Sequence, residues 1–292
     1  MSGERLAVAD KESKQSVAAA IEHVRAGAAQ GCDRIDFLGI PVCAVDMRGA
    51  IALVDSAIAE RSPLHIGVIN AAKVVGMARD PELRSAVLSS DAIFADGMSI
   101  VWASRLLGVP LPERVTGIDL MMNLLARGSE LGYRVFCLGA REDVSKRVAE
   151  IIGRDFPGVQ LVGRHHGYFS KDEEADIVKL IAAARPDMLF VAMTSPMKEN
   201  FLARWGSELN TTVTHGVGGS FDVLAGYVMR APPLWCSLGL EWLYRLKQEP
   251  RRLWKRYLVT NTVFCNMVLR AWLRRVRAGS EAHGRSSTGL GS

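Results

Sequence analysis

The chain has 292 residues, of which 49% are hydrophobic and 23% are charged, a composition typical of a globular protein with a sizeable core. This composition excludes a collagen, a coiled coil and a chain that is disordered throughout. The formal net charge is +5, but residues 245–277 alone carry ten basic residues and one acid, a net charge of +9 that leaves −4 for the rest. The basicity therefore belongs to one C-terminal segment.

The five cysteines lie far apart in the sequence, and no two of them form a CxxC pair. This spacing predicts neither a disulfide framework nor a structural zinc site, and it is typical of proteins from a reducing compartment. The N-terminus lacks the basic and then apolar profile of a signal peptide. We therefore expect a cytoplasmic protein.

Composition and periodicity divide the chain into four parts. Residues 1–34 form a flexible extension rich in Ala, Ser, Glu and Lys, and residues 35–238 form an α/β core. Residues 239–278 form a basic amphipathic helical appendage, and residues 279–292 form a disordered Gly/Ser-rich tail. The appendage contains the longest nearly apolar run, 257–273, but two asparagines and Arg270 interrupt it. This run predicts a helix that lies on a membrane surface and does not span the membrane.

Within the core, short apolar runs alternate with stretches of helical periodicity. Residues 35–45 predict two short strands around a Gly turn, and Asp46 follows in the position of a helix N-cap. Further strands are expected at 65–70, 92–96, 134–139, 159–163, 188–193 and 212–217, and helices after residue 70 and at 116–131, 143–155, 172–184 and 198–205. Continuous apolar strands between amphipathic helices predict an α/β, Rossmann-like fold, with a mostly parallel sheet covered on both faces.

Sheets of this class bind ligands beyond the carboxyl ends of their strands, which here are Asn70, Asp96, Gly139, Met193 and Gly218. Asp96 ends a short apolar strand and precedes a glycine, so its carboxylate would lie at the mouth of the sheet. A partly desolvated carboxylate in that position can act as a base on a hydroxyl group. The alternative, on spacing alone, is that Asp96 caps the helix that follows.

Two further segments contain candidate binding residues. The glycine-rich segment GVGGSFD, residues 216–222, would let backbone amides approach an anion closely, although a tight structural turn would have the same sequence. The polar loop 111–117 contains Arg114, which could bind a phosphate or a sugar carboxylate with two hydrogen bonds or could pair with a nearby acid.

Several familiar catalytic motifs are absent from the sequence, among them GxxxxGK[ST], HExxH, GxSxG and a full GxGxxG after the first strand. No DxD pair is present to hold a divalent metal. His165 and His166 are adjacent, so in a strand they would face opposite sides and could not bind one ion together. The sequence therefore predicts neither a metal site nor a cofactor.

The basic segment 239–257 interleaves cations with tryptophan and tyrosine. This composition suits an anionic bilayer, with aromatic rings at headgroup level and arginines on phosphates, and it would also suit nucleic acid. The net charge of −4 on the rest of the chain provides no extended basic surface. The apolar run that follows the basic segment would also gain nothing from binding a nucleic acid. The membrane is therefore the favoured partner, and nucleic acid is not expected.

Seven segments follow one another between residues 35 and 257: ADG with IVWASRLLG, LPERVTGIDL, VFCLGA, HHGYF, GVGGSFDVLAG, RAP and GLEWLYRLKQEPRR. Together they resemble the WecG/TagA/CpsF family of bacterial glycosyltransferases. The resemblance implies an inverting, metal-independent enzyme that moves a sugar from a UDP-sugar donor to a polyprenyl-diphosphate-linked acceptor in cell-surface or exopolysaccharide biosynthesis. It also implies a peripheral location on the cytoplasmic face of the membrane, and self-association.

The resemblance implies roles for individual residues. Asp96 is the expected general base on the acceptor hydroxyl, and Asn70 is expected beside it. The appendage is expected to reach over the site and to place arginines on a diphosphate, with Arg245, Arg251 and Arg252 as candidates. The residues expected to bind substrate are Arg114, Gly139, Ser195, Lys198, Glu199, Gly218, Gly219 and Asp222.

Two positions depart from the family pattern. Val68 replaces a threonine, and Lys198 replaces a glutamine in the segment SPMKE. Since a cation in place of a neutral amide is not a conservative change near a diphosphate, we expect N-acetylmannosamine or glucose as the donor sugar and not N-acetylmannosaminuronic acid. Lys198 itself is expected either to contact phosphate or to be solvated.

Two other functions remain as alternatives. One is a transferase of the same fold that acts on a soluble acceptor. The other is a catalytically silent scaffold at the membrane, and the joint presence of Asp96, Asn70 and Arg114 argues against it.

Overall fold

The structure is a computed structural model that describes residues 32–237 and 239–286. Residues 1–31, and with them nearly all of the predicted extension, lie outside the described part, as do residues 287–292 at the end of the predicted tail.

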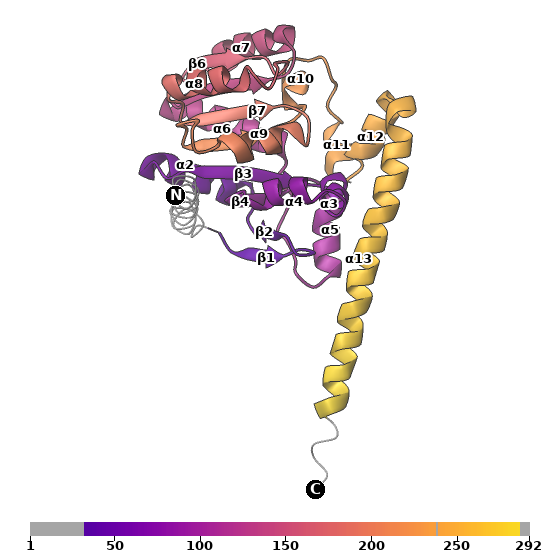
Figure 1. The fold of residues 1–292 in the computed structure, drawn as a ribbon. Coiled ribbons are helices and arrows are strands. Elements are labelled where there is room, and N and C mark those ends of the chain that lie inside the picture. Colours follow the sequence, from indigo (N-terminus) through magenta and orange to yellow (C-terminus); the bar gives the residue numbers. More distant parts are fainter. Residues whose placement is uncertain (1–31, 238, 287–292) are drawn as a thin grey trace, which may run out of the picture.

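A six-stranded sheet forms the centre of the described chain, in the strand order β4-β3-β8-β7-β5-β6 (Figure 1). Every neighbouring pair in this sheet is parallel. The strands are β3 (Leu64–Ile69), β4 (Ala92–Ala95), β5 (Arg134–Gly139), β6 (Gln160–His165), β7 (Met188–Ala192) and β8 (Val213–Gly216). The predicted α/β, Rossmann-like fold is therefore confirmed.

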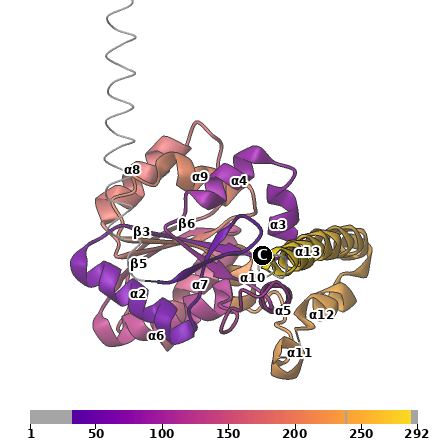
Figure 2. The same ribbon diagram turned by 90° about the horizontal axis from the view of Figure 1, so that it is seen from below.

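Helices cover both faces of the sheet (Figure 2). They are α2 (Met47–Glu60), α3 (Ala71–Met77), α4 (Pro81–Leu88), α5 (Met98–Leu106), α6 (Gly117–Leu131), α7 (Glu142–Asp155), α8 (Glu174–Ala184), α9 (Met197–Trp205), α10 (Ser220–Leu224), α11 (Pro233–Ser237), α12 (Glu241–Gln248) and α13 (Pro250–Ser286). Side chains alternate between the faces, so Val135 of β5 packs in the core under α2, α6 and α7, while its neighbour Phe136 packs under α8 and α9.

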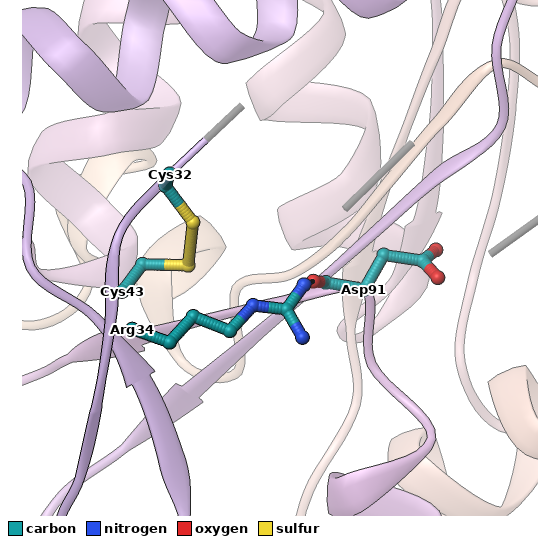
Figure 3. The surroundings of a disulfide bond; sticks show 4 residues. All are labelled: Cys32, Arg34, Cys43 and Asp91. Carbon is teal, nitrogen blue, oxygen red and sulfur yellow. Dashed lines mark hydrogen bonds between the residues drawn. A yellow bond between two sulfur atoms is a disulfide. The ribbon is translucent and has the colours of Figure 1, made fainter. Parts of the chain in front are cut away.

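A short antiparallel hairpin precedes the main sheet, as the sequence predicts. It consists of β1 (Arg34–Asp36) and β2 (Pro41–Cys43), and Asp46 caps α2 by accepting a hydrogen bond from the Gly49 amide at 2.7 Å. The side chain of Arg34 donates to the backbone carbonyl of Asp91 and so ties the hairpin to the segment before β4 (Figure 3).

Cys32 and Cys43 form a disulfide bond, with their Cα atoms 5.8 Å apart (Figure 3). The prediction of no disulfide is therefore wrong for this pair. The hairpin register is the reason, because Arg34 lies opposite Cys43 and brings Cys32 within bonding distance. Within the described residues, Cys137, Cys236 and Cys265 are free thiols.

The long helix α13 runs beside α3 and then extends past the body of the protein (Figure 1). Phe264 and Val268, 5% and 6% exposed, belong to the same buried cluster as residues of α3, α4 and α5. One face of the predicted membrane-surface helix is therefore part of the core. The helical backbone continues to Ser286, beyond the predicted end of the appendage at 278, and the sequence contains no proline that would end it there.

No helix in the described part of the chain is long and apolar enough to cross a membrane.

Candidate active site

Asn70 and Asp96 lie side by side at the carboxyl ends of β3 and β4. The two strands pair in register, with Ile69 opposite Ala95, so the residue after each strand emerges at the same edge of the sheet. The Asn70 side chain is fixed by its second role as the N-cap of α3, where Oδ1 accepts a hydrogen bond from the Lys73 amide at 3.0 Å. Its Nδ2 is left to donate to Asp96 Oδ2, 3.5 Å away.

Asp96 does not cap the helix that follows it. The N-cap position of α5 is Gly97, whose φ of 124° is a conformation that side chains rarely adopt. The capping alternative is therefore wrong, and the Asp96 carboxylate instead accepts a hydrogen bond from Asn70. Burial, together with the charge of Glu241, raises the pKa of Asp96, while the charges of Arg245 and Lys73 and the hydrogen bond from Asn70 lower it; the net shift is upward.

A buried group of three charges lies next to these residues. Lys73 Nζ is 2.8 Å and Lys198 Nζ is 3.0 Å from the same oxygen of Glu199, Oε1, and the exposed fractions of the three side chains are 8%, 10% and 8%. The expectation that Lys198 is solvated is therefore wrong. Gly216 leaves room for it, since a Cβ atom there would lie 3.0 Å from Lys198 Cε.

Opposing effects act on the ionisation of this group. Burial raises the pKa of Glu199, but the charges and hydrogen bonds of Lys73 and Lys198 outweigh it and bring the pKa down to about 2. Burial and the charge of Lys73 lower the pKa of Lys198, against the opposing effect of Glu199. Two cations and one anion leave this group with a net charge of +1, close to the strand ends where an anion would bind.

The appendage contributes a second charged group. Glu241 of α12 lies between two arginines, with Oε2 at 3.5 Å from Arg114 Nη1 and Oε1 at 3.0 Å from Arg245 Nη2. The chain enters α12 in close contact with α5, because a Cβ atom on Gly239 would lie only 2.7 Å from both Met98 and Trp102. The structure thus brings the predicted residues Arg114 and Arg245 together at the edge of the sheet that contains Asp96.

The other two arginine candidates are placed differently. Arg251 is exposed on the first turn of α13, and the side chain of Arg252 lies outside the described residues. Neither is brought to the site by a contact that the structure describes.

Backbone groups at the ends of β5, β7 and β8 line the neighbouring stretch of the same edge. Gly139 has a φ of 127°, and a Cβ atom there would overlap the carbonyl of Ala192. Gly218 has a φ of 56° and faces Lys198 Nζ, while a Cβ atom on Gly219 would meet open space. Ser195 is exposed before α9, and Asp222 lies in the first turn of α10. The central position of β8 places the Gly218 loop beside β3 and its Asn70.

Sequence reasoning missed two residues of this site, Lys73 and Glu241. Glu241 and Arg245 have the i, i+4 spacing of a helical ion pair, which could have indicated the pairing but not its partner Arg114. Lys73 had no comparable pattern, since its partners on α9 lie more than a hundred residues away.

The chain matches the Glycosyl transferase WecG/TagA/CpsF family over residues 35–278. It belongs to this family. It is similar to two proteins named N-acetylglucosaminyldiphosphoundecaprenol N-acetyl-beta-D-mannosaminyltransferase. The one from Bacillus spizizenii is 38% identical over 180 residues, which cover 62% of this chain and 69% of that protein. The one from Bacillus subtilis is 36% identical over 193 residues, which cover 66% and 74%.

This member of the WecG/TagA/CpsF family is therefore a glycosyltransferase. The matched range includes the strand-end residues of the sheet, both lysines of the buried group and all of α12. The two charged groups described above therefore lie within the part of the chain that matches the family.

Glu199→Gln should destabilise this glycosyltransferase, because it leaves two buried lysines without a counter-charge. We expect the free energy of unfolding, measured by urea titration at pH 7, to fall by about 3–5 kcal/mol. The matched control is Glu208→Gln, the same change at an exposed glutamate shortly after α9, and it should have little effect on the free energy of unfolding.

The same variant should show a specific pH dependence. Since the pKa of Glu199 is about 2 in the folded state and about 4.3 in an unfolded chain, its stabilisation is complete above the unfolded value and is lost as the pH falls towards 2. The stability difference between wild type and Glu199→Gln should therefore shrink below pH 5. Equal stabilities at pH 7 would contradict the buried ion-pair account.

Proposed function

We propose that this glycosyltransferase moves N-acetylmannosamine, or a glucose-type sugar, from a UDP-sugar to a polyprenyl-diphosphate-linked acceptor, with inversion at the anomeric carbon. The observation that carries the proposal is the partly buried Asp96 carboxylate, which accepts a hydrogen bond from Asn70 and interacts electrostatically with a cation from each charged group, Lys73 and Arg245. The names of the two relatives describe transfer of a mannosaminyl group to a diphosphoundecaprenol-linked N-acetylglucosamine, which supports the same class of acceptor here.

In the proposed reaction, Asp96 accepts the proton of the acceptor hydroxyl as that oxygen attacks the anomeric carbon. A bond forms from the oxygen to this carbon, the bond from the carbon to the donor phosphate breaks, and its electron pair leaves with UDP. The raised pKa of Asp96 makes its carboxylate a stronger base than that of an exposed aspartate. Asn70 keeps the carboxylate facing the acceptor.

Cations of this chain take up the charge that develops on UDP. The Lys73, Glu199 and Lys198 group carries a net charge of +1, and so does the Arg114, Glu241 and Arg245 group. Fixed positive charges in a partly desolvated site stabilise a departing diphosphate strongly. The backbone amides of Gly218 and Gly219 add donors for the phosphate oxygens. With these groups in place, the proposed transfer needs no metal ion.

Asp96→Asn should abolish most turnover while leaving the fold intact, because an amide of the same shape cannot accept the proton. We expect kcat to fall by about 10²–10⁴-fold in an assay of UDP release. In the wild type, the rate should fall as the pH drops through the raised pKa of Asp96, and this acid limb should be absent from the residual rate of the variant. Asp172→Asn, at an exposed aspartate, is the control. Near-normal activity of Asp96→Asn would remove Asp96 from its role.

The donor and the metal requirement can be tested together. With a short polyprenyl-diphosphate-linked N-acetylglucosamine as acceptor, we expect transfer from UDP-N-acetylmannosamine or UDP-glucose, no transfer from the uronic acid donor, and an unchanged rate in excess EDTA. A strict magnesium requirement would contradict the metal-independent mechanism. Transfer to a soluble glycan alone would favour the soluble-acceptor alternative, and inactivity with every donor would favour the silent scaffold.

We further propose that the enzyme binds the inner face of the cell membrane peripherally, through the outer surface of α13. Leu258 and Leu269, 61% and 51% exposed, lie on the opposite side of the helix from the buried Phe264. They belong to a stripe of exposed apolar side chains on this side of the helix, with successive spacings of 4, 11, 4 and 3 residues, that is completed by Trp254, Leu273 and Val276. Exposed arginines at 270, 274 and 277 lie beside this stripe. An apolar stripe beside a basic one suits an anionic lipid surface.

The double variant Leu258→Glu/Leu269→Glu should lose membrane binding, because it removes apolar area and adds charge that anionic lipid repels. We expect its binding to anionic vesicles, measured by flotation, to fall at least about tenfold. Leu180→Glu, on the exposed side of α8, is the matched control and should float like the wild type. Equal flotation of the double variant would exclude the outer surface of α13 as the contact.

A further inference from the structure

Glu241 stands out because it is an acid at the point where an anionic substrate is expected. Its two carboxylate oxygens each face a different guanidinium, Oε2 towards Arg114 and Oε1 towards Arg245. A phosphate group binds two arginines in the same way, with separate oxygens on separate guanidinium groups. Glu241 is mostly shielded from solvent, and so is Arg114, so these are not two surface charges that meet by chance.

We propose that Glu241 is an internal counter-anion that occupies the place of the donor diphosphate between Arg114 and Arg245 and is displaced when a nucleoside diphosphate binds. This inference rests on the proposed function, since it takes the arginines as the diphosphate site. It assigns to Glu241 a role in setting donor affinity and product release and not a direct role in the chemical step.

The two contacts of Glu241 differ in a way that suits displacement. Arg245 is one turn further along the same helix, so this pair persists wherever α12 lies. The contact with Arg114 connects α12 to the body of the protein, and at 3.5 Å it is long. A long, partly solvated ion pair contributes little free energy and exchanges readily for a more highly charged partner.

The packing of the chain before α12 indicates what moves. Gly239 lies against Met98 and Trp102 so closely that a side chain would not fit, which fixes the start of α12 on α5. Two residues later, Glu241 can leave the arginines by rotation of its side chain, without movement of the helix. Once displaced, it lies near the diphosphate as a like charge, which favours release of UDP after transfer.

Glu241 also acts on the ionisation of Asp96. The charged groups that act on Asp96 are Glu241 and Arg245 from α12 and Lys73 from α3, and Lys198 from α9 interacts with it as well. The negative charge of Glu241 raises the pKa of Asp96, and Arg245 and Lys73 lower it. Neutralising Glu241 should therefore lower the pKa of Asp96 in the free enzyme.

The test is the Glu241→Gln variant of the full chain, with UDP as the probe in titration calorimetry at fixed ionic strength. Because the competing charge is removed while the shape is kept, we expect the Kd of UDP to fall at least about fivefold. The acid limb of the kcat/KM profile, which reports the free enzyme, should move to lower pH. Glu208→Gln should change neither quantity.

A second measurement uses the wild-type protein alone and does not depend on how the variant folds. In a crystal structure with UDP, the Glu241 carboxylate should have left at least one of the two arginines. Persistence of both contacts with UDP bound would overturn the proposal.

The outcomes separate this inference from the proposed function. UDP affinity that is unchanged or weaker in Glu241→Gln would overturn the counter-anion role alone, because the arginines would then need the glutamate to bind UDP. Failure of UDP to bind the wild type would contradict the proposed donor class, and this inference with it.

Discussion

The parallel pairing of β3 with β4 is the constraint on which the site depends. The hydrogen-bonded register puts Ile69 opposite Ala95. The backbone positions of the next residues, Asn70 and Asp96, are then fixed, and only their side-chain rotamers remain free. Asn70 loses that freedom by capping α3, and Asp96 gains its orientation because the cap of α5 is a glycine. Two residues 26 positions apart in sequence thus come within hydrogen-bonding distance, as the proposed base and its orienting partner require.

Charge compensation shapes the rest of the site. Taking cations out of water costs free energy unless an anion is close, and each pair of cations here shares one glutamate. Glu199 does this for two buried lysines, and Glu241 does it for two arginines nearer to solvent. The two groups differ in how far their side chains are buried, and their expected roles differ accordingly. The buried pairing of Glu199 stabilises the fold, while the longer and more solvated contact of Glu241 with Arg114 suits the proposed exchange for a substrate anion.

The helix α13 serves more than one purpose along a single apolar run. Residues on one face, such as Phe264 and Val268, complete the core around α3, and the leucines on the other face remain exposed beside arginines. Periodicity alone predicts a lipid surface for the whole run, because it shows that a helix has apolar faces but does not show which of them the body covers. Only the packing against α3 separates the two faces.

The sequence by itself determined the fold class, most strand and helix positions, the helix cap at Asp46, and the family, through ordered segments that lie within the matched range 35–278. These features are local, or are repeated along the chain, so short-range periodicity and motif order reveal them. Metal independence, self-association and the division into an extension, core, appendage and tail stay predictions.

The tertiary structure decided which residues meet. The Cys32–Cys43 disulfide, the burial of Lys198 with Lys73 and Glu199, and the position of Glu241 between Arg114 and Arg245 all follow from contacts between separate elements. A sequence lists the charges of a site but not their distances or their exposure to water, and electrostatic free energies depend on both. That is why the sequence could name Lys198 as a binding residue, and only the folded chain could show that it is buried and paired.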